Sequence, residues 1–216
     1  MIIFIPIKEK SQRVPGKNFR KINGVELYKN LLYKLSNHQV FIDTDSDLII
    51  DDIKNDKNLK NVCTYKRKEQ LIGHEVSVCD LIENFIIEKS MHDKLICQIH
   101  VTSPFIKEKT LKNAFGKFAS GYDSVVSCNI YQNRLWRKEK YGYCPINHNP
   151  LRLEQTQDLP EYYEENSLFY MFQANKFLKT KSRIGNHPFF YACNFPENID
   201  IDTEDDWNIV KTIAGE

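Results

Sequence analysis

The sequence predicts an α/β fold in which helices flank a mixed, mostly parallel sheet. Short apolar runs rich in β-branched residues start near the first residue and recur along the chain. Segments with apolar residues three and four positions apart lie between these runs, as in helices with one buried face. Such alternation of strand and helix is typical of parallel sheets. The 216 residues can build one core without disulfides, so we expect a single domain over residues 1–216.

Each expected element follows from its local pattern. The expected strands are apolar runs that suit the middle of a sheet: Ile2–Ile7, Gln39–Ile42, Leu95–Val101, Ser124–Cys128, Leu168–Phe172 and Phe189–Ala192. The expected helices are Leu27–Ser36, Val76–Glu88, Thr110–Ala119 with Thr110 as its N-cap, and Glu204–Ala214. Ligands bind beyond the carboxyl ends of parallel strands, so we expect the site in the loops after Ile7, Ile42 and Val101 and around residues 199–201.

Residues from 129 to about 166, called the excursion below, break this pattern. They are polar, with interspersed aromatic residues and prolines. A connection of this length is unusual in a compact domain. We expect the excursion to cover the site or to pack against a partner subunit.

Composition excludes several classes of protein. The 30 Lys and Arg and 29 Asp and Glu give a net charge of +1, which argues against a binder of nucleic-acid polymers. No apolar run could span a bilayer, and the apolar start lacks the flanks of a signal peptide, so we expect no membrane contact. The 6 cysteines form no C-x-x-C pair, which favours reduced thiols in the cytoplasm.

Two charged segments are candidates for chemistry. The loop after the first expected strand carries Lys8, Lys10, Arg13 and Lys17, which suits a polyphosphate or simply a solvated basic loop. Near the end of the chain, Asp200 and Asp202 alternate with isoleucines and share one face of an extended segment. That pair could bind Mg²⁺, or Asp202 or Thr203 could cap the last helix, and both can hold. The acids of residues 43–47 read as a strand end and helix cap.

Several motifs, in the same order and spacing, resemble those of the CMP-sugar synthetases, the acylneuraminate and CMP-Kdo cytidylyltransferases. The matching segments are Lys8 to Asn18, Phe41 to Asp45, Arg67 with Leu71 and Ser77, Thr102 to Pro104, Asp123 to Ser127, Gln157 to Pro160 with Asn166 and Tyr170, and Ile199 to Glu204. They span nearly the whole chain, which we therefore identify as a divergent member of this family.

The resemblance implies a single cytidylyltransferase domain with a Rossmann-like, nucleotide-diphospho-sugar-transferase-like fold. It implies transfer of CMP from CTP to an acidic acceptor, with release of pyrophosphate and with Mg²⁺ as cofactor, in CMP-sugar biosynthesis for cell-surface glycans. It also implies a homodimer formed through the excursion. The implied roles are catalytic for Lys8, Arg13 and Lys17, nucleotide-binding for Ser11, Asn18, Arg67, Ser77 and His100, acceptor-binding for Arg152, Gln157, Asn166 and Tyr170, and metal-binding for Asp200 and Asp202.

Departures from the family pattern bear on the acceptor. Thr156 stands where the sialic-acid enzymes carry an arginine for the sugar carboxylate, and Arg152 is the candidate substitute. Gln12 stands where those enzymes carry a lysine, whose charge Arg13 can supply. A nonulosonic, sialic-acid-like sugar is the first expectation for the acceptor, and a small phosphonate or phosphorylated acceptor is the second. A glycosyltransferase using Asp200 and Asp202 as a D-x-D metal site, and a non-catalytic nucleotide-binding protein, are more distant alternatives.

Overall fold

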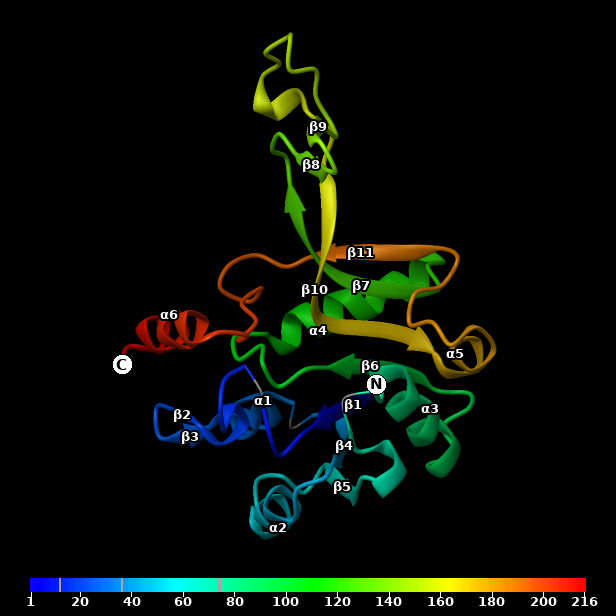
Figure 1. Ribbon diagram of the computed structural model, residues 1–216. Coiled ribbons are helices and arrows are strands. Elements are labelled where there is room, and N and C mark those ends of the chain that lie inside the picture. The colour runs from blue at the N-terminus through cyan, green and yellow to red at the C-terminus, as the bar shows by residue number, and fades with distance from the viewer. Residues whose placement is uncertain (12, 36, 74) are drawn as a thin grey trace.

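The computed structural model describes residues 1–11, 13–35, 37–73 and 75–216. Within these ranges, one mixed sheet of seven strands has the order β11-β7-β10-β6-β1-β4-β5 (Figure 1). The strands are β1 (Ile2–Ile7), β4 (Gln39–Thr44), β5 (Val62–Lys66), β6 (Leu95–Ile99), β7 (Ser124–Tyr131), β10 (Tyr162–Gln173) and β11 (Pro188–Ala192). Only β10 runs antiparallel to its neighbours in this sheet, so the predicted mixed, mostly parallel topology is confirmed.

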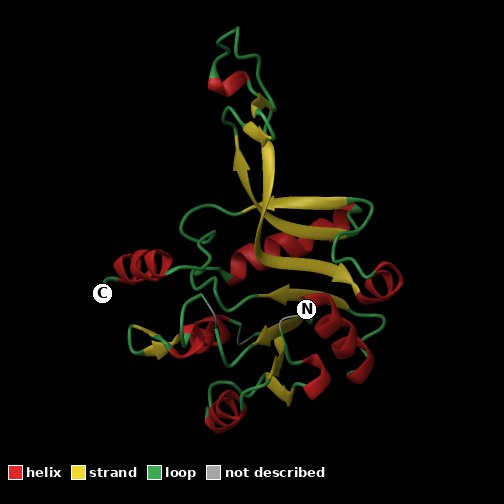
Figure 2. Cartoon of the chain, in the orientation of Figure 1, coloured by secondary structure: helices red, strands yellow, loops and turns green. Residues whose placement is uncertain are grey.

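Helices cover both faces of the sheet (Figure 2). They are α1 (Leu27–Lys34), α2 (Asp47–Asn55), α3 (Val78–Glu88), α4 (Glu108–Phe115), α5 (Ala174–Thr180) and α6 (Glu204–Ala214), with 3-10 turns η1 (Lys17–Phe19), η2 (Glu69–Leu71), η3 (Gly116–Ser120) and η4 (Thr156–Asp158). Alternate residues of β1 face opposite layers, so Ile3 and Ile5 pack with α1, α2 and α4. Phe4 packs with α3 and α5 on the other face, where it stacks on Phe85.

The structure corrects some of the expected elements. Thr110 is not an N-cap: α4 begins at Glu108 after Lys107, and the Thr110 hydroxyl instead donates to Glu197 (2.6 Å). The elements β5, α2 and α5 were not expected. The edge strand β5 alternates exposed and half-buried residues, so it lacks the apolar run by which the central strands are recognised.

The excursion forms an arm that projects from the sheet (Figure 1). Its stem is the end of β7 paired with the start of β10, and a small hairpin, β8 (Trp136–Glu139) with β9 (Gly142–Pro145), lies beyond it. A second small hairpin, β2 (Lys21–Ile22) with β3 (Val25–Glu26), precedes α1. The described helices include none that is long and apolar enough to cross a membrane. The 6 cysteines form no disulfide within the described chain.

Candidate nucleotide-binding site

A cavity of about 270 Å³ opens where β1 and β6 end, at the edge of the sheet where the sequence predicts the site. Six of the predicted residues line it, namely Lys8, Ser11, Lys17, Asn18, Arg67 and His100. Its apolar wall comes from the start of α3, where Val76, Val78 and Leu81 face the cavity. Cations on one side and an apolar wall on the other suit a ligand with a charged end and a flat, less polar end.

The loop after β1 is fixed by contacts within the chain. Gly16 has a left-handed φ of 64°, a conformation that glycine adopts readily, and the η1 turn begins at the next residue. The Asn18 amide donates to the carbonyl of Lys8 (2.7 Å), and the Glu9 N–H donates to Asp45 (2.7 Å). The Lys8 ammonium reaches across to the carbonyl of Gly73 (3.3 Å). Gln12, the residue that departs from the family pattern, lies outside the described residues.

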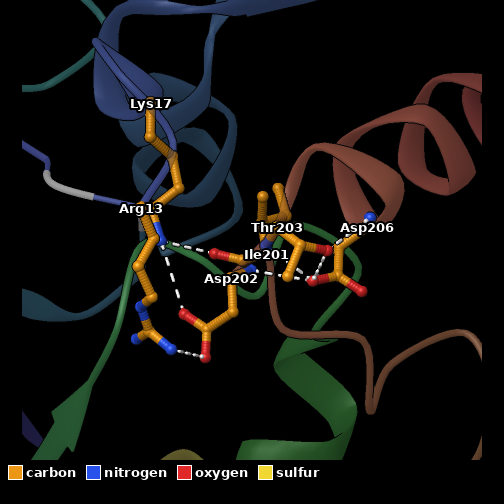
Figure 3. A network of polar contacts seen from close by, with 6 residues as sticks. All are labelled: Arg13, Lys17, Ile201, Asp202, Thr203 and Asp206. Carbon is orange, nitrogen blue, oxygen red and sulfur yellow. Dashed lines mark hydrogen bonds and ion pairs between the residues drawn. The ribbon is translucent and has the colours of Figure 1, made fainter.

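Lys17 is a buried cation between the first loop and the last (Figure 3). Its ammonium donates to the carbonyl of Ile201 and lies 3.7 Å from a carboxylate oxygen of Asp202. Burial lowers the pKa of Lys17, while the charges of Asp202 and Asp200 oppose that shift. The contact places a positive charge from the start of the chain beside the acids at its end.

Arg13 also contacts Asp202, with 2.7 Å between the guanidinium nitrogen and the carboxylate oxygen (Figure 3). The backbone of Asp202 is held from the other side, because its N–H donates to Asp206 (3.0 Å). Thr203 and Asp206 form a capping box at the start of α6, so the predicted helix cap at Thr203 is confirmed. The segment that carries the acids is therefore anchored to a helix terminus.

Asp200 is the less satisfied of the two acids. Its Oδ1 atom is buried and has no hydrogen-bond partner, and burial raises the pKa of this carboxyl group. No three His, Cys, Asp or Glu side chains gather as a metal site in the parts of the chain described. Carboxylate oxygens are nevertheless the ligands that Mg²⁺ takes in proteins, and this ion commonly completes its shell with phosphate and water, so the chemistry of Asp200 and Asp202 is compatible with it.

Arg67 lines the cavity and forms a buried ion pair with Asp43. Its guanidinium also donates to the carbonyls of Ile7 (3.2 Å) and Asp43 (3.1 Å), which ties the ends of β1 and β4 together. Ser77 does not itself line the cavity; its hydroxyl caps α3 by accepting from the Asp80 N–H (3.2 Å). Asp43 was predicted only as part of a strand end, because an acid after an apolar run gives no local signal of a buried ion pair.

His100 follows β6 directly and faces the cavity. Burial lowers its pKa to about 4, and the nearby charges of Arg183 and Lys17 act in the same direction. The imidazole is therefore neutral at pH 7, where it can donate one hydrogen bond and accept another.

The family model described as Cytidylyltransferase matches residues 2–213 of the chain. The chain belongs to the cytidylyltransferase family. The resemblance seen in the sequence motifs is thereby confirmed for a divergent member.

The relatives that the chain matches are distant. It is 24% identical to the CMP-N,N'-diacetyllegionaminic acid synthase of Legionella pneumophila, a match covering 99% of this chain and 95% of the relative. It is 21% identical to an N-acylneuraminate cytidylyltransferase of Streptococcus agalactiae, covering 95% of this chain and 51% of that protein. The chain thus spans about half the length of the streptococcal relatives that it matches.

Solved structures share the fold of this chain. CMP:2-keto-3-deoxy-manno-octonic acid synthetase complexed with CTP superposes with a TM-score of 0.67 at 14% identity, covering 99% of this chain and 98% of the other. The 4-diphosphocytidyl-2C-methyl-D-erythritol synthase of Anaerococcus prevotii also gives a TM-score of 0.67, at 12% identity, over 100% of this chain and 96% of that one. These similarities confirm the predicted fold class.

The predicted acceptor-binding residues lie in two separate places. Tyr170 is buried in the sheet, and its hydroxyl lies 2.7 Å from Glu165. Asn166 donates to Asn129 (3.1 Å) at the base of the excursion. Arg152 and Gln157 lie between β9 and β10, in the excursion, and neither lines the cavity.

Proposed function

We propose that this chain is an enzyme that transfers CMP from CTP to a small acidic acceptor and releases pyrophosphate. One observation carries the proposal. A single cavity at the carboxyl ends of the strands joins the cations Lys8 and Lys17 to an apolar wall, with Asp200 and Asp202 at the contact of Lys17. A triphosphate fits the charged side, and a pyrimidine base fits the wall formed by the start of α3.

In the proposed reaction, an oxygen of the acceptor attacks the α-phosphorus of CTP, and a hydroxyl acceptor gives up its proton to water. A new P–O bond forms while the bond to the β-phosphate oxygen breaks, and pyrophosphate leaves with the electron pair. Negative charge grows on the leaving group during this step. We propose that Lys8, Arg13 and Lys17 stabilise it, because cations held close to a developing negative charge lower the energy of the transition state. Lys8 and Lys17 line the cavity, and Arg13 contacts Asp202 beside Lys17.

The acids at the end of the chain are our candidates for the Mg²⁺ site. Asp200 and Asp202 would hold the ion, which when bound screens the charge of the phosphates and orients them. The pairing of Asp202 with Arg13 and Lys17 satisfies these charges in the structure described. We propose that both cations exchange this carboxylate for phosphate oxygens when CTP binds.

A nonulosonic, sialic-acid-like sugar is our first choice of acceptor. The names of the Legionella and Streptococcus relatives support this class. The two solved structures carry names with other acceptors, an octonic acid and a methylerythritol, so the fold is compatible with several acceptor classes. A small phosphonate or phosphorylated acceptor is our second choice. A nonulosonic acceptor would place the enzyme in CMP-sugar biosynthesis for cell-surface glycans, in the cytoplasm where CTP is available.

We also propose that the excursion forms a homodimer. Its tip exposes large apolar side chains, including Leu151 (96% exposed), Leu153 (88%) and Tyr141 (89%). Large apolar groups of this kind, gathered on one projecting segment, are typical of a surface that a partner covers.

The direct test is to incubate the chain with CTP, Mg²⁺ and a panel of acceptors, and to measure pyrophosphate. The panel contains sialic acid, a legionaminic-type acid, Kdo and an aminoalkylphosphonate. We expect pyrophosphate with at least one acidic acceptor. Absence of pyrophosphate with all of them, combined with sugar transfer or hydrolysis from a UDP- or GDP-sugar, would favour a D-x-D glycosyltransferase.

A further inference from the structure

Arg183 occupies an unusual position on the face of the sheet that carries α3 and α5. It follows α5, and its guanidinium carbon lies 3.6 Å from the centroid of the Tyr170 ring. The same guanidinium donates to the side-chain oxygen of Gln98 (2.6 Å). The aromatic ring and the amide therefore fix the plane and the direction of the guanidinium before any ligand arrives.

The polar groups of this cluster are not fully used. No ion pair joins Arg183 to a carboxylate within the described ranges, although its guanidinium has five N–H donors. The amide nitrogen of Gln98 is buried and lacks an acceptor, and the whole residue is 0% exposed. A buried N–H group without an acceptor is costly. An oxyanion beside Arg183 and Gln98 would satisfy both residues at once.

The cluster lies near the nucleotide cavity without lining it, and Arg183 lines a separate cavity of about 370 Å³ together with Asp123 and Lys176. Gln98 and Tyr170 face each other in the pairing of β6 with β10. His100 comes two residues after Gln98, directly after the end of β6, and lines the cavity. The charge of Arg183 is close enough to His100 to lower its pKa, in addition to the larger effect of burial.

We propose that Arg183, with the amide of Gln98, binds the acidic group of the acceptor. The proposal rests on the cytidylyltransferase function proposed above and names the residue that recognises the acceptor. A carboxylate and a phosphonate share the required chemistry, because both offer two oxygens to the forked N–H groups of a guanidinium. Tyr170 then acts as the platform that holds Arg183 in this orientation.

Arg183 would supply the positive charge that is missing at Thr156, where the sialic-acid enzymes carry an arginine for the sugar carboxylate. Thr156 carries no charge, and Arg152 lies in the excursion, between β9 and β10. An acidic group enclosed in a site without a cation would lose its hydration without compensation. Arg183 lies in the body of the protein, on the same sheet face as the apolar wall that α3 gives to the nucleotide cavity.

The test compares each acceptor with its methyl ester, which removes one negative charge and leaves the rest of the molecule intact. The measurement is kcat/KM by pyrophosphate release, with a nonulosonic acid in one arm and an aminoalkylphosphonate in the other. We expect the wild type to prefer the acid in the arm that contains the true acceptor class. In Arg183→Gln, this acid-to-ester ratio should fall by about 10- to 100-fold, which corresponds to the loss of a charged hydrogen bond. Arg183→Lys should be intermediate, and the KM for CTP should not change.

Matched variants separate the possible causes. Lys112→Gln removes an exposed positive charge from α4, on the opposite face of the sheet, and should leave the ratio unchanged. A fall in thermal stability of Arg183→Gln with an unchanged ratio would show a purely structural role and overturn the proposal. The proposal would also be overturned if the acid-to-ester ratio fell in Arg152→Gln but not in Arg183→Gln. Absence of pyrophosphate from the wild type with every acceptor would instead overturn the proposed function itself, together with this inference.

Discussion

Lys17 shows how single residues set the electrostatics of the site. It is 8% exposed and is held by a carbonyl and a carboxylate from the other end of the chain. A buried ammonium is stable only when oxygen atoms replace the water it has lost. Phosphate oxygens can replace the oxygens of Ile201 and Asp202 around the ammonium. The contact that stabilises Lys17 in the unbound protein therefore also holds its charge ready for a phosphate ligand.

Replacing Lys17 by alanine should reduce kcat/KM for CTP by about 100-fold or more, because the leaving pyrophosphate would lose one positive charge that stabilises it. Steady-state pyrophosphate release measures the effect. Lys10→Ala is the matched control, since Lys10 is exposed in the same loop and does not line the cavity. Equal losses in the two variants would mean that only the overall charge of the loop matters.

Asp202→Asn should abolish Mg²⁺-dependent turnover while the protein stays folded. The amide keeps the size of the side chain but loses the charge that attracts the ion and that now pairs with Arg13. Activity is titrated against Mg²⁺, and circular dichroism checks the fold. Turnover at the level of the wild type would refute the metal assignment.

His100 should make the protein less stable in mild acid. Its pKa is about 4 in the folded state, against about 6.5 for an unperturbed histidine. Between these values the unfolded chain takes up a proton that the folded chain refuses, so stability falls as the pH is lowered through this window. His100→Gln should remove about 1 to 2 kcal/mol of the stability difference between pH 7 and pH 5. Urea unfolding at the two pH values tests this, and identical differences in variant and wild type would contradict it.

At the scale of elements, α6 is the clearest case of a helix end that positions a site. Its capping box fixes Thr203 and Asp206, and Asp206 also accepts the N–H of Asp202. One carboxylate thus holds the start of the helix and the backbone of the acidic segment (Figure 3). The geometry of the acids is set by a helix terminus rather than by a flexible tail.

Thr203→Ala should lower the free energy of unfolding by about 1 kcal/mol, as expected for the loss of an N-cap side chain. Because the same cap holds Asp202, the apparent affinity for Mg²⁺ should fall as well. Thr203→Ser keeps the hydroxyl and serves as the control. Urea unfolding and Mg²⁺ titration of activity are the measurements, and an alanine variant with unchanged values in both would contradict the coupling.

The central strands were predictable because they are buried on both faces. In β1, Ile3, Phe4 and Ile5 are all 0% exposed, so the sequence reads as one apolar run. Elements at the periphery were not predictable in the same way. In α2 the buried residues Ile49, Ile50 and Ile53 alternate with acidic residues, because the helix buries only one side.

The basic loop and the acidic pair were predictable as separate segments, since each carries its charges within a few residues. Their contact, and the pair between Arg67 and Asp43, depend on the order of strands in the sheet. Neither that order nor the stacking of Arg183 on Tyr170 has a signal in the local sequence.

At the scale of the whole molecule, the excursion and the body differ in how they bury apolar groups. The body has a continuous core on both faces of the sheet. The excursion has a two-stranded hairpin, which by itself buries little, and several of its large apolar residues, such as Leu151 and Leu153, are exposed.

We therefore expect the chain to be a dimer in solution. Leu151→Glu combined with Leu153→Glu should convert it to a monomer, because two charges would have to be buried in the interface. Sedimentation velocity measures the change. Lys54→Glu on α2 is a control that adds negative charge far from the excursion in sequence. A wild-type chain that sediments as a monomer at all concentrations would refute the dimer.

The irregularity in β10 has a consequence for how such enzymes diversify. Strand pairing with β7 shifts between Glu165 and Tyr170, so the outer and inner halves of β10 keep separate registers. Residues added to or lost from the outer half are absorbed at this shift, and Tyr170 still pairs with Gln98. A change in the length of the arm therefore need not displace the sheet in the body of the protein. For protein engineers, the shift marks a joint at which the arm of one family member can be grafted onto the body of another.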